Sequence, residues 1–164
     1  MNHTIIHMGE SKEAWFRDAF KEYQKRMNAF GGLEDIALKP AKTPGRELSP
    51  DEITLALEKE AAEFEKLLST PKYQKSYKIA LCIEGKTLSS EGLADLFEKV
   101  AGGGKNSVVY LIGSSWGLSE RVKSACDLRL SFSPMTFAHS LFRVMLAEQI
   151  YRAAGICAGS KYHK

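Results

Sequence analysis

The apolar positions of this chain change period along its length, which predicts short buried strands separated by amphipathic helices. Residues 4–8 form a β-branched and apolar run that ends at Gly9, as expected of a buried strand. Over residues 13–30 large apolar side chains recur every three or four positions, which favours a helix with one covered face, and two glycines follow as its end. Residues 33–39 are the second predicted strand.

The same alternation continues to the end of the chain. Ser49 and Glu52 form a capping box with Pro50 at the first helical position, and the helix that they open carries an apolar stripe down to Leu68. Beyond it we expect strands at 77–83, 107–112 and 127–131, and helices at 89–100, 119–125 and 139–154. Because strands and helices alternate throughout, the pattern predicts an α/β fold with a mainly parallel sheet and helices on both faces, in a single domain over residues 1–164.

The composition is that of an ordinary globular protein, with 164 residues of which 44% are hydrophobic and 26% are charged. Three cysteines without a CxxC pair argue against a zinc site and a disulfide framework, and favour a reducing compartment. The four histidines show no spacing typical of metal ligands. No basic leader precedes an apolar stretch at the start, and no run approaches the roughly 18 apolar residues of a membrane span. We therefore expect a soluble cytoplasmic protein with no metal and no membrane association.

The net charge of +3 is unevenly distributed along the chain. Residues 1–120 carry 16 Lys and Arg against 18 Asp and Glu, whereas residues 121–164 carry 7 against 2. A basic C-terminal quarter with interleaved aromatic residues is typical of contact with an anionic partner such as nucleic acid. A solvated basic face on a helix is the alternative interpretation.

Two common nucleotide-binding motifs are absent. The run of glycines at 102–104 before Lys105 lacks the first glycine of a phosphate-binding loop, because that position is Lys99, and it follows a predicted helix instead of a strand. No GxGxxG follows a predicted strand, and there is no GxSxG elbow of a hydrolase.

Three other segments, 81–86, 113–118 and 131–139, each follow or end a predicted strand. In a parallel sheet they would open on one edge, where glycines let the backbone approach a ligand and irregular loops offer N–H and C=O groups. The residues alone therefore predict a nucleotide-like pocket at this edge.

These segments also carry a resemblance. The patterns LxIxGK, IGxxxGL and LSFSxMTFxH, followed by RVxLxEQxYRA and a terminal YHK, resemble the RlmH family of SPOUT-type RNA methyltransferases over residues 4–164. The resemblance implies a trefoil knot near the C-terminus, a homodimer, and S-adenosyl-L-methionine as methyl donor. It also implies methylation at N3 of a pseudouridine in bacterial 23S rRNA, within the large subunit or the assembled ribosome.

Carried over by position, the resemblance places the methyl donor against eight residues: Leu81, Gly113, Phe132, Ser133, Pro134, Met135, Thr136 and Phe137. For Leu81, Phe132 and Phe137 ordinary core packing is the alternative. The sequence departs from the family pattern at Ser114, where many members have a second glycine, and at Ala138, where proline usually precedes the histidine. We expect the first change to narrow the mouth of the pocket and the second to loosen the turn into the last helix.

Methylation at N3 requires the N3 proton to leave, so the site needs a proton acceptor and a cation near the uracil oxygens. Arg143 is the predicted cation, facing either RNA phosphate or uracil. His139 and His163 are the candidate proton acceptors, and Tyr162 and His163 on the tail are expected to act on the substrate. A structural hydrogen bond is the alternative role for His139.

The last predicted helix suggests two further features. Glu148 and Arg152 are spaced to form an i, i+4 ion pair. Apolar residues at Phe137, Leu141, Phe142, Val144 and Leu146 exceed what one covered face needs, which favours a homodimer.

Two other functions fit the same residues. One is a ribosome-associated RNA-binding module that keeps the fold without methyl transfer, and the other is a methyltransferase of this fold acting on another RNA. The presence of both the donor segments and the terminal YHK favours retained transfer.

Overall fold

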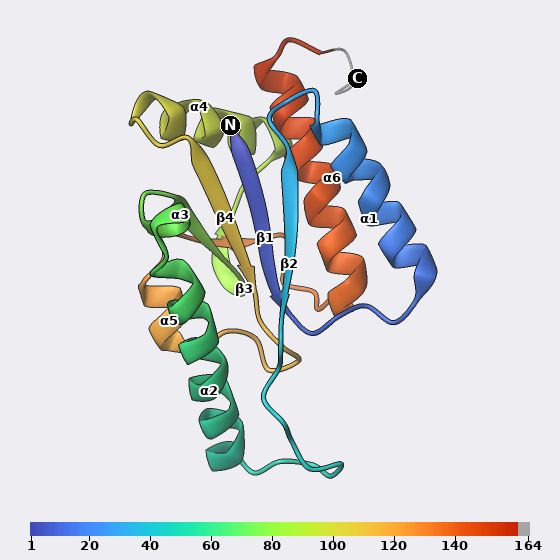
Figure 1. The fold of residues 1–164 in the computed structure, drawn as a ribbon, viewed down its shortest axis with the longest axis vertical. Helices are drawn as coiled ribbons and strands as arrows, with labels where there is room; N and C mark the ends of the chain where they lie inside the picture. The colour runs from blue at the N-terminus through green and yellow to red at the C-terminus, as the bar shows by residue number, and fades with distance from the viewer. Residues whose placement is uncertain (161–164) are drawn as a thin grey trace.

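A computed structural model describes residues 1–160 and places five parallel strands in one sheet with the order β2-β1-β4-β3-β5 (Figure 1). The strands are β1 (Asn2–Met8), β2 (Leu33–Leu38), β3 (Tyr77–Thr87), β4 (Ser107–Ile112) and β5 (Leu128–Ser131). Every pairing is parallel, which confirms the predicted sheet. The trefoil knot that the resemblance implies stays a prediction.

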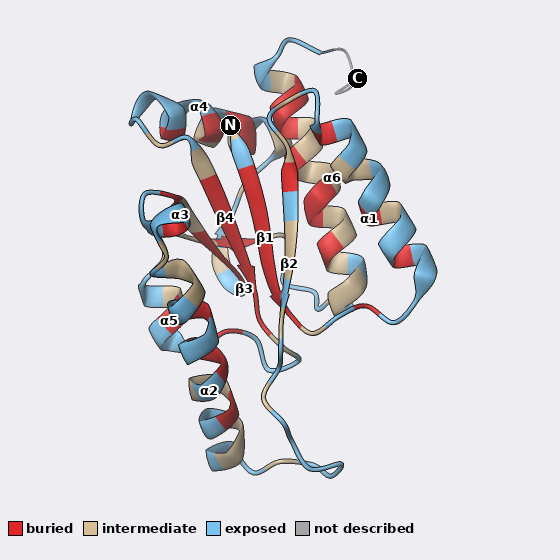
Figure 2. Cartoon of the chain, viewed as in Figure 1, coloured by how far each residue is buried: buried red, intermediate tan, exposed pale blue. Residues whose placement is uncertain are grey.

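Helices cover both faces of this sheet. They are α1 (Ala14–Met27), α2 (Pro50–Leu68), α3 (Pro71–Gln74), α4 (Ser90–Gly102), α5 (Glu120–Ser124) and α6 (His139–Cys157). Successive residues of β1 point to opposite sides, so Ile5 packs in the cluster under α1, α4 and α6, and Ile6 packs in the cluster under α2, α3 and α5. Figure 2 shows the result, with β1 and β4 buried along most of their length between the two layers.

Most helices and strands begin and end close to the positions that the sequence predicts. The capping box at Ser49 and Glu52 is formed, and β4 has the predicted bounds. The first helix ends at Met27, three residues before the predicted end, and the last helix runs to Cys157, three residues beyond it. The short helix α3 was not predicted, although Pro71 lies at its first position.

The main difference lies in β3, which extends to Thr87 and pairs with β5 in two registers, shifted between Leu81 and Lys86. The irregularity contains Gly85, where a Cβ would lie 2.7 Å from the backbone carbonyl carbon of Leu130. β3 and β5 therefore approach each other too closely for any residue other than glycine at position 85. The need for glycine comes from the neighbouring strand and cannot be inferred from the local sequence pattern.

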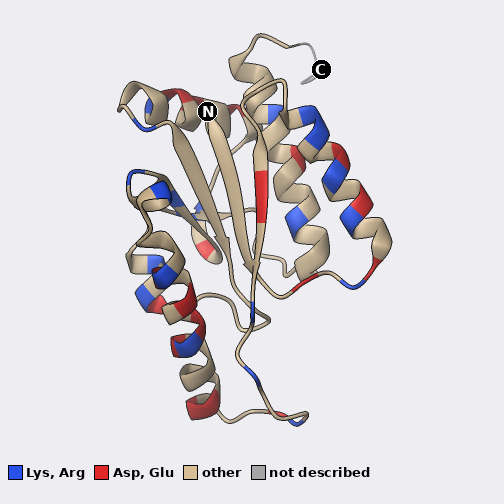
Figure 3. Cartoon of the chain, viewed as in Figure 1, with Lys and Arg blue, Asp and Glu red and all other residues tan. Residues whose placement is uncertain are grey.

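Charged side chains lie on the outer surfaces of the layers. Figure 3 shows both signs interspersed along α1 and α2, and no charged residue on β1 or β4. Within the described part of the chain, no helix combines the length and the apolar character needed to cross a membrane.

Candidate active site

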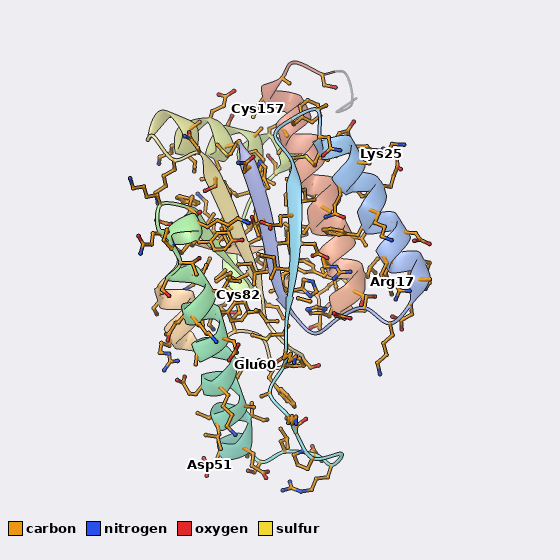
Figure 4. The ribbon with its side chains drawn as sticks, viewed as in Figure 1. Arg17, Lys25, Asp51, Glu60, Cys82 and Cys157 are labelled. Atoms are coloured by element: carbon orange, nitrogen blue, oxygen red, sulfur yellow. The ribbon has the colours of Figure 1, made fainter. Side chains whose placement is uncertain are left out.

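The carboxyl ends of β4 and β5, together with the irregular part of β3, surround a cavity of about 570 Å³. Its walls come from residues 81–84, 112–118 and 130–139, with Phe142 of α6 closing one side. Cys82, labelled in Figure 4, marks the β3 wall. The three segments predicted to share one edge of the sheet therefore do so, and the cavity has the size of a small-molecule site.

Seven of the eight residues expected to contact the donor line this cavity, and Pro134 does not. Two serines stabilise the loop after β5 by local hydrogen bonds. The Ser131 hydroxyl donates to the carbonyl of Ser133 at 3.2 Å, and the Met135 amide donates to the Ser133 hydroxyl at 3.0 Å. Leu81 is also part of the hydrophobic core, so it supports the fold as well as the cavity wall.

A tight turn forms the β4 wall. The Gly117 amide donates to the Ser114 carbonyl at 2.9 Å, and Gly117 has a φ of +80°. A Cβ on Gly113 would lie 2.0 Å from the carbonyl oxygen of Gly117. The turn itself therefore requires glycine at Gly113, a reason that differs from the close ligand approach expected from the sequence.

Two polar atoms at the cavity lack a partner. The hydroxyl of Ser114 and Nε2 of His139 are buried and make no hydrogen bond within residues 1–160, and both residues line the cavity. Buried polar groups are nearly always hydrogen-bonded. A polar ligand in the cavity would supply the missing partners.

Arg143 does not face solvent but lies in a buried polar cluster with His7 and Asp35. Its residue is only 4% exposed, and its Nη1 donates to Nε2 of His7 at 2.7 Å and lies 3.4 Å from Oδ2 of Asp35. The guanidinium also packs over the Phe20 ring at 5.0 Å. The expected cation thus faces β1, β2 and α1 of its own chain, one helical turn after His139.

Other side chains of α6 also contact residues of their own chain. Glu148 and Arg152 form the predicted i, i+4 ion pair at 2.6 Å. Tyr151 packs against Tyr23 of α1 and against Phe30 in the loop after α1. The face shared by Arg143 and Tyr151 is therefore turned toward α1. The predicted substrate residues Tyr162 and His163 lie outside the described residues.

His139 stands between this cluster and the cavity. Its ring centroid lies 5.5 Å from that of His7. Burial is the main reason that the pKa of His139 is lowered to about 4, and the neighbouring His7 ring and Arg143 guanidinium lower it further. At neutral pH the imidazole is uncharged and its unpaired nitrogen is free to accept a hydrogen bond from a ligand, but a group with this pKa binds a proton only weakly.

Sequence reasoning missed His7 and Asp35, because a histidine within an apolar strand and an aspartate on the next strand carry no local signal. Their significance comes only from Arg143, which is 136 residues from His7 in the chain. Within residues 1–160 no group of three or more His, Cys, Asp or Glu side chains is placed to hold a metal ion.

Comparisons with known proteins agree on the family. A family profile described as "Predicted SPOUT methyltransferase" matches residues 1–163. "Ribosomal RNA large subunit methyltransferase H" of Bacillus pumilus is 42% identical over 164 residues, covering both chains completely. "Putative ribosomal RNA large subunit methyltransferase H" of Methanococcus maripaludis is also 42% identical over the whole of both chains.

Solved structures resemble the fold at low sequence identity. A probable methylase family protein from Haemophilus influenzae has a TM-score of 0.53 and 12% identity, covering 99% of this chain and 70% of that one. A probable methyltransferase from Bordetella pertussis has a TM-score of 0.52 and 13% identity, covering 93% of each chain. At these identities the likeness concerns the arrangement of the elements alone.

Proposed function

The chain belongs to the SPOUT methyltransferase family, and from this premise we propose that it methylates N3 of a pseudouridine in 23S rRNA, with S-adenosyl-L-methionine as donor. The observation that carries the proposal is the single cavity that the three family-like segments form at the carboxyl ends of β4 and β5 and the irregular part of β3. The name of the full-length relatives, ribosomal RNA large subunit methyltransferase H, supports ribosomal RNA as the substrate class.

The cavity fits this donor in size and in chemistry. Apolar walls from Leu81, Ile112 and Leu130 suit the flat adenine ring, and unpaired polar atoms on Ser114 and His139 suit its polar groups. When bound, S-adenosyl-L-methionine supplies a methyl group on a positively charged sulfur. The walls hold the reactants in line and exclude water, which lowers the barrier to transfer.

The proton on N3 has to leave the acceptor ring. Neutral His139 is placed to accept a hydrogen bond within the cavity, but its low pKa makes it a poor final proton acceptor. We propose that His163 of the tail is the final proton acceptor and that Tyr162 acts on the substrate, since the resemblance implies a substrate-site role for the tail. Arg143 is buried against His7 and Asp35, so we assign it a positioning role next to His139 in place of direct contact with the RNA.

The remaining features of the proposal concern the assembly. We propose a homodimer that acts in the cytoplasm on the large subunit or the assembled ribosome. A single chain of 18.2 kDa with a net charge of +3 offers little basic surface for phosphate, and much of its basic charge is paired. Two copies acting on a preformed RNA surface would offset this limitation.

The Ser114 hydroxyl gives the most specific test of the donor cavity. Replacing Ser114 by Ala removes one buried, unpaired oxygen and adds no bulk. We expect donor affinity, measured by calorimetry, to fall several-fold while the free energy of unfolding stays equal or rises, because the unsatisfied hydroxyl is lost. Ser11→Ala also removes a buried, unpaired hydroxyl but lies outside the cavity lining, so it is the matched control and should bind the donor as the parent does. Equal affinity in the Ser114 and Ser11 variants would place the donor elsewhere.

A further inference from the structure

The outer rim of the cavity is apolar and exposed. Ile83 in the irregular part of β3 is 53% exposed, Trp116 on the turn after β4 is 38% exposed, and Met135 on the loop after β5 is 70% exposed. Large apolar side chains are rarely left in water together unless they meet a partner. Three separate segments therefore each contribute an exposed apolar residue to the lining of one cavity.

Trp116 is held rigidly at this rim. The turn that carries it is closed by the Gly117 amide on the Ser114 carbonyl and packs tightly against Gly113. Among residues 1–160, its indole makes no hydrogen bond and no contact with another aromatic ring, whereas the other tryptophan, Trp15, stacks on Phe16 at 3.4 Å between ring centroids. An indole carried on such a turn at the cavity offers a flat surface to a flat ligand.

We infer that Trp116 forms a stacking surface for the target nucleobase of the RNA substrate, with Ile83 as a further apolar residue at the same rim. This inference rests on the proposed function. Methyl transfer requires the acceptor base to reach the cavity mouth in line with the donor, and single bases displaced from RNA are commonly held by stacking on aromatic side chains.

The charges at the rim favour a base over a phosphate. Lys123, the basic residue that lines the cavity, is paired with Glu84 of β3 and with Glu120 at 3.0 Å. Arg129 nearby also pairs with Glu120. With these cations neutralised, the rim attracts an uncharged aromatic face more strongly than the RNA backbone.

The position of Trp116 also distinguishes the base from the donor. Three of the donor contacts proposed above, Leu81, Ile112 and Leu130, are buried in the cavity wall. Trp116 lines the same cavity but is 38% exposed, so part of its side chain remains open to solvent. It therefore determines how the acceptor binds, not how the donor binds.

Steady-state methyl transfer to large ribosomal subunits from a strain lacking the modification tests this inference, with the donor saturating. We expect Trp116→Leu, which keeps the apolar volume but loses the ring, to lower kcat/KM for the subunits about tenfold through a higher KM. Trp116→Phe should restore most of the loss. Donor affinity measured by calorimetry should remain within twofold of the parent in both variants. Trp15→Leu, an exposed tryptophan outside the cavity lining, is the control and should transfer at the parent rate.

Either of two results would overturn the inference. Parent kinetics in Trp116→Leu would show that no base stacks there, and a parallel loss of donor affinity would assign Trp116 to the donor. If the parent itself transfers no methyl group to these subunits, the proposed function fails first, and the two failures are thereby distinguished.

Discussion

Among single residues, Arg143 is expected to affect stability strongly. It is a buried cation, and its partners His7 and Asp35 lie on β1 and β2, which are far from Arg143 in the sequence. Removing it in Arg143→Ala leaves His7 and Asp35 facing an empty space. We expect the free energy of unfolding, from urea titration, to fall by about 3 kcal/mol. Arg46→Ala, which breaks an exposed pair with Glu52, should cost much less, because solvent screens a pair at the surface. Equal, small losses in both variants would contradict the buried position of Arg143.

Two buried histidines predict the acid sensitivity of the fold. Burial lowers the pKa of His3 to about 3, assisted by the charged N-terminus, and lowers that of His139 to about 4. Unfolded histidine titrates near 6.5, so the unfolded chain takes up protons first as the pH falls, and stability decreases from about pH 6.5 toward pH 4.

The expected loss from His3 is at most about 2 kcal/mol at pH 5, and the loss from the less buried His139 is smaller. Urea titrations at pH 7.5 and pH 5 measure the total. His3→Gln should reduce the difference between the two pH values, because glutamine does not titrate. An unchanged difference in this variant would remove His3 from the explanation.

Among the elements of the site, the turn at 113–117 is expected to tolerate substitution least. A Cβ on Gly113 meets the Gly117 carbonyl, so Gly113→Ala should cost about 2 kcal/mol of stability and weaken donor binding with it. A Cβ on Gly45 meets no atom within 4 Å, so Gly45→Ala is the matched control and should change neither quantity. Thermal unfolding and calorimetry on both variants decide the question, and a fully stable Gly113→Ala protein would contradict the turn geometry.

Local sequence patterns predict where a strand or helix occurs better than they predict how far it extends. The apolar run at 107–112 and the capping box at Ser49 are sufficient to place β4 and the start of α2. The extension of β3 to Thr87 depends on pairing with β5, a tertiary contact that no local pattern contains. The cavity edge follows from the parallel order of the strands, whereas the His7, Asp35 and Arg143 cluster requires the folded chain because its members are so distant in sequence.

At the scale of the whole molecule, the apolar residues at the start of α6 bear on assembly. Leu146 is fully buried in the core of its own chain and therefore cannot belong to the predicted dimer surface. Leu141 remains exposed, and Phe137, Phe142 and Val144 are half-buried. We expect light scattering at micromolar concentration to give twice the 18.2 kDa chain mass, and Leu141→Glu to shift it toward the monomer. A monomer mass for the parent would rule the dimer out.

Nucleoside mass spectrometry can detect methyl transfer to N3 of a pseudouridine in 23S rRNA. Large subunits and assembled ribosomes from a strain lacking the modification are incubated with the protein and isotopically labelled S-adenosyl-L-methionine, and the RNA is then digested. We expect label in 3-methylpseudouridine at one position of 23S rRNA, and no label when the donor is omitted. Labelled methyl in another nucleoside, or donor binding without any labelled RNA, would contradict the account.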